Sequence, residues 1–246
     1  NVLYFNKDSK GIIWFDQSRY GLCLFNERTG KITYGNNADA LYSLTVASIV
    51  PSQKEDAVWL GGRNDFSSQI WKATQQEMSI SILEKYDLKE VDSSPGNITQ
   101  LIEDNHGNIW IGTTSRLFFK PANSKKIVTL SFDIPHVSDM SKDSKGNIWI
   151  ASQDAIYQMS YESKPTLLKQ YSKKSIPLHE DPIIKISANA HDVWFSTSLG
   201  RLLRLNPSEG KITDETESCG LTGDNILEII RYGDKIWIVC EKCAFL

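Results

Sequence analysis

Six tryptophans recur at a nearly constant spacing along the 246-residue chain, and this repeat limits the fold more than any other feature. The separations between them are 45, 51, 39, 45 and 43 residues. The residues in register are Trp14, Trp59, Trp110, Trp149, Trp194 and Trp237, whereas Trp71 lies outside the register. A period of about 40 to 45 residues is typical of proteins built from one repeated supersecondary unit.

A polar turn precedes each tryptophan strand. The best copies run from Asp104 to Asn108 and from Asp143 to Asn147, and a shorter copy runs from Asp8 to Gly11. An aspartate side chain can cap the backbone amides of such a turn, and Gly or Asn accepts the positive φ that a tight reversal needs. We therefore expect hairpins here, with these aspartates capping turns rather than reacting.

The pattern around the turns predicts four strands per repeat. First strands are expected over 2–5, 45–50, 98–103, 137–142, 183–188 and 226–231, and third strands over 22–25, 117–120, 156–159 and 202–205. Two copies of Gly-Lys-Ile-Thr, at 30–33 and 210–213, begin fourth strands. Helical periodicity is not sustained anywhere, and 78–86 reads as a strand.

Four short strands per repeat predict an all-β chain, a β-propeller of about six four-stranded blades. The tryptophan strands are apolar on both faces, as expected where sheets stack face to face, so the tryptophans should pack between blades. We expect one domain over 1–246 with blades near 1–40, 41–92, 93–134, 135–178, 179–220 and 221–246. The last copy stops within its third strand, which favours a piece of a larger protein and leaves open an incomplete seven-bladed ring.

Charge and hydropathy exclude several classes of protein. The 27 basic and 30 acidic residues are interspersed, which argues against a nucleic-acid partner. No apolar stretch approaches the ~18 residues that span a bilayer, so membrane attachment is expected only through parts of a parent chain.

The stretch from Ile102 to Thr113, with a weaker copy from Asp143 to Ile150, resembles the two-component regulator propeller repeat. That repeat builds the periplasmic sensor region of hybrid two-component receptors in Bacteroidetes. The resemblance implies a sensor segment of an inner-membrane histidine kinase receptor, one that recognises oligosaccharides and regulates polysaccharide utilisation. The kinase parts lie outside this chain, so we expect no enzymatic activity from it, and a scaffold or dimerisation propeller without its own ligand is the alternative.

Catalytic constellations are scarce in the sequence. His106 and His191 are placed in turns, and His136 and His179 in links between blades. A second alternative, a streptogramin-lyase-like propeller, would need a histidine and an acid that converge, and the candidates for this are the adjacent residues His179 and Glu180. Nucleophile elbows, phosphate loops and zinc spacings do not occur, so we predict no catalytic residue, metal or cofactor.

The four cysteines do not form a disulfide framework. Cys240 and Cys243 flank an expected reversal between strands, where a cross-hairpin disulfide is sterically allowed and the periplasm would permit it. Two ordinary strand residues are the alternative. Cys23 is expected in the core and Cys219 in a link between blades.

The links between second and third strands are the candidate ligand-binding surface, because propellers bind ligands on that face. Four of the six links carry an arginine, and the residues singled out are Arg19, Tyr20, Arg63, Asn64, Asp65, Arg116 and Arg201. Guanidinium forks and aromatic rings suit sugar hydroxyls, carboxylates and sulfates, so an acidic or sulfated oligosaccharide is favoured. The alternative is a solvated rim without a ligand.

Overall fold

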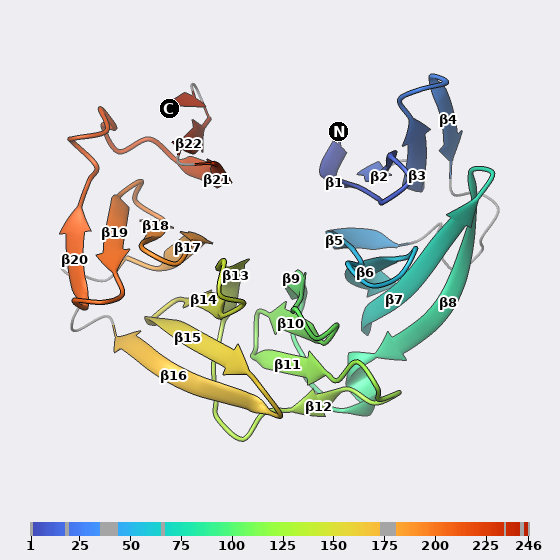
Figure 1. Ribbon diagram of the computed structural model, residues 1–246, viewed down its shortest axis with the longest axis horizontal. Coiled ribbons are helices and arrows are strands. Elements are labelled where there is room, and N and C mark those ends of the chain that lie inside the picture. The colour runs from blue at the N-terminus through green and yellow to red at the C-terminus, as the bar shows by residue number, and fades with distance from the viewer. Residues whose placement is uncertain are drawn as a thin grey trace. The chain divides into compact units, whose positions relative to one another are not determined.

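The computed structural model describes residues 2–17, 20–34, 44–64, 67–172, 181–233, 235–241 and 244–245. The chain forms two compact units, 1–133 and 134–246. The described residues form an all-β propeller fold of six antiparallel sheets, in each of which consecutive strands pair (Figure 1). Five sheets have four strands and the last has three.

Unit 1 contains the first three blades and one short 3-10 helix, η1 (Leu88–Glu90). Its strands are β1 (Val2–Lys7), β2 (Ile12–Gln17), β3 (Gly21–Asn26), β4 (Lys31–Tyr34), β5 (Thr45–Pro51), β6 (Val58–Asn64), β7 (Ser67–Gln76), β8 (Ser79–Asp87), β9 (Ile98–Glu103), β10 (Ile109–Thr113), β11 (Leu117–Lys120) and β12 (Val128–Thr129).

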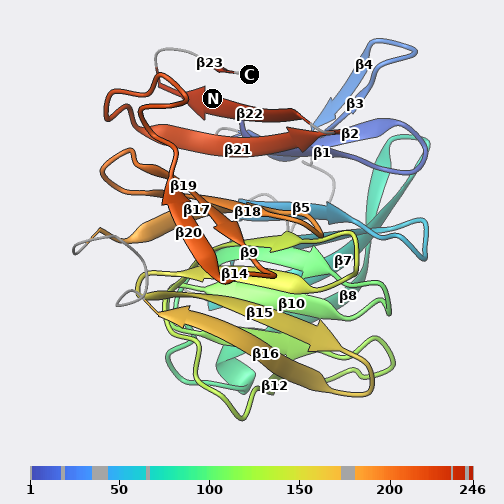
Figure 2. The same cartoon turned by 60° about the vertical axis from the view of Figure 1, so that its left-hand side comes forward.

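Unit 2 contains the other three blades, whose sheets stack on one another (Figure 2). Its strands are β13 (Val137–Lys142), β14 (Ile148–Ser152), β15 (Ala155–Tyr161), β16 (Pro165–Ser172), β17 (Ile183–Ala188), β18 (Val193–Thr197), β19 (Leu202–Asn206), β20 (Lys211–Asp214), β21 (Ile226–Tyr232), β22 (Lys235–Cys240) and β23 (Ala244–Phe245). The first strand β17 contacts the first strands β13 and β21 of the blades on either side of it (Figure 1).

The strands agree closely with the sequence pattern. The first strands expected over 98–103, 137–142 and 183–188 have the observed bounds of β9, β13 and β17. The strand expected over 78–86 is β8, shifted by one residue to 79–87, and both Gly-Lys-Ile-Thr copies lead into fourth strands. In the described part of the chain, no helix is long and apolar enough to cross a membrane.

Three of the polar turns are capped by one aspartate each, at Asp8, Asp104 and Asp143. In the β9–β10 hairpin, Oδ1 of Asp104 accepts hydrogen bonds from the backbone N–H groups of His106 (2.9 Å) and Asn108 (3.0 Å). Gly107 takes the left-handed conformation that the reversal needs, with φ +83°. The prediction that these aspartates cap turns is confirmed.

The same carboxylate also binds the tryptophan, which the sequence pattern did not predict. Oδ2 of Asp104 accepts a hydrogen bond from the Trp110 indole N–H at 3.0 Å. The matching bonds are Asp8 to Trp14 at 2.8 Å and Asp143 to Trp149 at 3.0 Å. We call this arrangement, an aspartate bound to the indole six residues later, the indole clasp. It satisfies a polar group that burial would otherwise leave unpaired.

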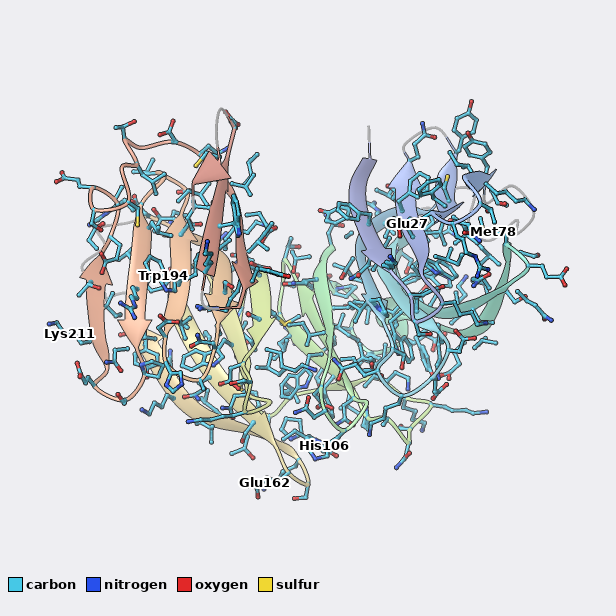
Figure 3. All side chains as sticks on the ribbon, turned by 45° about the horizontal axis from the view of Figure 1, so that its top comes forward. Glu27, Met78, His106, Glu162, Trp194 and Lys211 are labelled. Carbon is cyan, nitrogen blue, oxygen red and sulfur yellow. The ribbon has the colours of Figure 1, made fainter. Side chains whose placement is uncertain are left out.

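Four register tryptophans are buried as predicted, since Trp14, Trp59, Trp110 and Trp149 are at most 3% exposed. The clusters that hold Trp14, Trp59 and Trp149 each combine residues of two neighbouring blades. The prediction is wrong for Trp237, which is 40% exposed. Trp237 pairs across the strands with Ile230, which is also exposed, whereas the buried face of that sheet is formed by residues such as Ile229 and Ile238. Trp194, labelled in Figure 3, is partly exposed.

Candidate ligand-binding site

The links between second and third strands lie at the end of each sheet opposite the first hairpin, because the strands run antiparallel in chain order. Of the residues predicted to bind ligand there, Arg19 and Asp65 lie outside the described residues. Tyr20, Arg63 and Arg116 belong to three different sheets of unit 1, and Arg201 belongs to unit 2. Each is therefore considered in its own surroundings.

Tyr20 forms an aromatic pair in the first blade. Its ring centroid lies 4.8 Å from that of Tyr34, with the planes tilted by 46°. Tyr34 ends the outer strand β4 and is 44% exposed. A partly exposed aromatic pair offers an apolar ring face to a sugar, and Tyr34 was not foreseen because it lies fourteen positions from Tyr20 along the chain.

Arg116, in the β10–β11 link, is oriented by a carboxylate from the link that precedes its blade. Its Nη1 lies 3.2 Å from Oδ2 of Asp92. Arg116 also lines a hollow of about 200 Å³ together with residues 117 and 129–133. Because a guanidinium has five N–H donors, the pair with Asp92 leaves donors for a ligand in this hollow.

Arg201 is held in a similar way within its own blade. Its Nη2 and Nε lie 2.5 Å and 3.1 Å from Oδ2 of Asp214 on β20. Burial raises the pKa of the Asp214 carboxyl, but hydrogen bonds from Thr216 and Arg201 outweigh it, so that pKa lies below its ordinary value. The arginine therefore faces a permanent anion at neutral pH.

Arg63, exposed at the end of β6, pairs in register with Thr45, and Asn64 closes that strand opposite Ser67. The sequence predicted the arginines of these links, but it did not identify the carboxylates that hold Arg116 and Arg201. Asp92 and Asp214 could have been suspected only from strand pairing, because they lie 24 and 13 residues from their arginines.

Polar residues on the first strands form a second set that the sequence analysis missed. Asp139 accepts a hydrogen bond from the backbone N–H of Ile186 at 2.9 Å, and Ser48 accepts one from Leu101 at 3.0 Å. Each joins one blade to the next. Burial raises the pKa of Asp139 to about 7, against the opposing effect of Lys185. Each lies two residues after a buried valine, at a point where the strand register shifts, Val46 before Ser48 and Val137 before Asp139. A polar residue two positions after a valine in an expected first strand is the sequence pattern that could have identified them.

The reactive residues are dispersed. His106 and His191 lie in turns and His136 in a link, as predicted (Figure 3 labels His106), while His179 and Glu180 lie outside the described residues. Cys23 is buried and Cys219 lies in a link, as expected. Cys240 is buried at the end of β22, but Cys243 lies outside the described residues, so their disulfide stays a prediction. Among the residues that the structure describes, no cluster of His, Cys, Asp or Glu could hold a metal ion.

The chain is similar in structure to several solved proteins. These include virginiamycin B lyase from Staphylococcus aureus (TM-score 0.69, 18% identity, 97% of this chain and 77% of that one). They also include the extracellular domain of BT4673 from B. thetaiotaomicron, described as a hybrid two component system (TM-score 0.67, 15% identity, 99% of this chain and 37% of that one). A third is PorZ of the type-IX secretion system of Porphyromonas gingivalis (TM-score 0.71, 16% identity, 99% of this chain and 38% of that one). The chain thus spans under two fifths of the last two proteins, and such low identity shows the fold alone.

The sequence comparisons are more specific. A search of curated protein sequences finds no match to the chain. Residues 92–115, which contain the whole β9–β10 hairpin with Asp104 and Trp110, match the family model "Two component regulator propeller". The resemblance inferred from this hairpin is confirmed, and the chain is a β-propeller that carries the two-component regulator propeller repeat.

Proposed function

We propose that the chain is an extracytoplasmic ligand-sensing segment of a hybrid two-component receptor, and that it recognises an oligosaccharide to regulate polysaccharide utilisation. The repeat over residues 92–115 supports this role, as does structural likeness to an extracellular domain of a protein described as a hybrid two component system. In this proposal the chain binds the ligand in the periplasm, and the membrane helix and kinase belong to other parts of the receptor.

One observation carries the ligand-binding part of the proposal. Arg116 is fixed by Asp92 at the edge of a hollow of about 200 Å³, with N–H donors to spare. A guanidinium held in place loses less side-chain entropy on binding than a mobile one, so its hydrogen bonds to a sugar contribute more to affinity.

An array of plant and host oligosaccharides, probed with the labelled chain, tests the proposal. We expect selective retention of one glycan class, reduced about tenfold in Arg116→Gln. Arg28→Gln, an exposed arginine in the β3–β4 turn, is the matched control and should bind as the wild type does. A chain that retains no glycan on the array contradicts the proposal.

A scaffold or dimerisation role is the second candidate, and the last sheet favours it. Exposed apolar side chains gather on β21 and β22, where Leu227, Ile230 and Trp237 are 45%, 48% and 40% exposed. Apolar side chains grouped on one strand pair are typical of protein interfaces. Light scattering that finds a dimer in the wild type and a monomer in Trp237→Ser would support this role, and a monomeric wild type would count against it.

A further inference from the structure

A cleft of about 440 Å³ lies in unit 1, lined by residues of the second and third blades. One lip is formed by the end of β8 and by η1, with Asp87 and Glu90, and the other by the loop before β12, with Lys125 and Lys126. Tyr86 and Ile127 also line it. Its volume lies in the range of about 300 to 1,000 Å³ that is usual for small-molecule sites.

Tyr86 is held in place by a charged cluster beneath it. Its hydroxyl donates a hydrogen bond to Glu84, whose carboxylate lies 3.9 Å from Nζ of Lys120. The Nζ of Lys120 lies 5.2 Å from the centroid of the Tyr86 ring. The centroids of the Tyr86 and Trp59 rings are 6.5 Å apart. The Lys120 side chain is only 3% exposed, so the cluster cannot rearrange freely. The aromatic ring in the cleft is therefore pre-organised.

The two lips differ in the charge they can offer to a ligand. Asp87 already accepts hydrogen bonds from Ser67, from Gln69 at 2.9 Å and from the backbone N–H of Lys89 at 2.8 Å. Lys125 and Lys126 are exposed, and within the described residues neither ammonium group pairs with a carboxylate. The cleft lining thus offers a ligand two ammonium groups and, from Glu90, one carboxylate, none of which is in an ion pair within the described residues.

We propose that this cleft binds an anionic sugar residue, which stacks on Tyr86 and places its carboxylate or sulfate against Lys125 and Lys126. Glu90 accepts hydrogen bonds from sugar hydroxyls on the opposite lip. The inference rests on the proposed oligosaccharide-sensing function and names the chemical class of ligand and a site for it. Surface ion pairs contribute little by themselves, so the fixed ring and the enclosed volume supply most of the affinity and the lysines supply the selectivity for charge.

Calorimetric titration with three probes tests the site, using a galacturonate trisaccharide, a sulfated heparin disaccharide and neutral maltotriose. We expect one of the two acidic probes to bind more tightly than maltotriose, which identifies the anionic group. Lys125→Gln with Lys126→Gln should weaken that binding at least tenfold at low salt. The matched control, Lys31→Gln with Lys211→Gln, removes the same charge from exposed positions elsewhere (Lys211 is labelled in Figure 3) and should stay within twofold of the wild type.

Tyr86 supplies an independent check. Tyr86→Phe keeps the ring and should bind within threefold of the wild type, whereas Tyr86→Leu removes the ring and should bind at least tenfold more weakly. Thermal unfolding of each variant establishes that it is folded.

The outcomes separate this inference from the proposed function. Undiminished acidic-probe binding by the double lysine variant overturns the cleft but leaves oligosaccharide sensing intact, as does a chain that binds only maltotriose. A chain that binds none of the three probes and no glycan on the array overturns both.

Discussion

The β9–β10 and β17–β18 hairpins meet the same requirement in different ways. In the first, Asp104 alone holds both the turn and the Trp110 indole. In the second, Asn189 holds the turn by accepting hydrogen bonds from the N–H groups of His191 and Asp192 at 2.7 and 2.8 Å. Asp192 then accepts the Trp194 indole N–H at 3.2 Å.

Separating the two tasks changes what the carboxylate can do. Asp192 lies 2.8 Å from Nη2 of Arg231 and 3.0 Å from Nη2 of Arg204, so one carboxylate joins two blades of unit 2. The indole is then partly exposed, whereas Trp110 is buried. A carboxylate binds the indole in four of the six blades, and its position in the hairpin decides whether it also caps the turn or joins two blades.

The first strands show a parallel contrast. Ser48 and Asp139 make the same bond to the next blade, one with a neutral hydroxyl and the other with a titratable carboxyl. In unit 1 this bond is independent of pH, whereas in unit 2 it involves a group that titrates near neutrality.

The largest expected effect is on the pH dependence of unit 2. Burial raises the pKa of Asp139 to about 7, with Lys185 lowering it and Glu228 raising it. The unfolded chain loses this proton near pH 4 and the folded chain near pH 7, so the wild type loses stability as pH rises between them, by up to about 4 kcal/mol. Asp139→Asn removes that loss. Urea denaturation from pH 4 to 8 measures it.

The control for this prediction is Ser48→Ala, which should shift stability equally at every pH. Parallel pH profiles of the wild type and Asp139→Asn would show that the two first strands do not differ as described.

Breaking the clasp in the β9–β10 hairpin is the next largest effect. Asp104→Ala leaves the buried Trp110 N–H and two turn amides without their acceptor, and should lower the free energy of unfolding by about 3 kcal/mol. Asp104→Asn keeps an acceptor oxygen and should cost less. Denaturant titration measures both, and equal losses in the two variants would contradict the clasp.

Removing the shared carboxylate in the other hairpin should cost about 2 kcal/mol, because Asp192→Ala leaves the guanidinium of Arg231 largely buried without its anion. Adding Arg231→Ala to that variant should recover part of the loss. A double-mutant cycle at these two positions measures the coupling, and a coupling near zero would make Asp192 equivalent to an exposed residue.

Arg204→Ala should have the smallest effect, within about 0.5 kcal/mol, since its side chain is 50% exposed. If Arg204→Ala lowered the free energy of unfolding as much as Asp192→Ala does, the exposed Arg204 would contribute as much as the buried Arg231. That result would contradict the role given to the bond between Asp192 and Arg231.

The sequence was sufficient for the strands and not for the contacts between them. Apolar runs, turn residues and the tryptophan register depend on local chemistry, so β9, β13 and β17 were predicted residue for residue. The partners of Arg116 and Arg201 come from other links and strands, and Tyr86 is paired through Glu84 with a lysine 36 residues away. Local patterns do not encode such pairs. The exposure of Trp237 was missed because its strand has the same apolar pattern as the buried ones.

Hydrogen exchange with and without saturating galacturonate trisaccharide or heparin disaccharide measures whether this propeller segment binds an acidic sugar. We predict slower amide exchange around residues 86–91 and 124–127, the two segments that contain the residues lining the cleft, with the turn at 206–210 unchanged. Identical exchange along the whole chain with and without either sugar would contradict it.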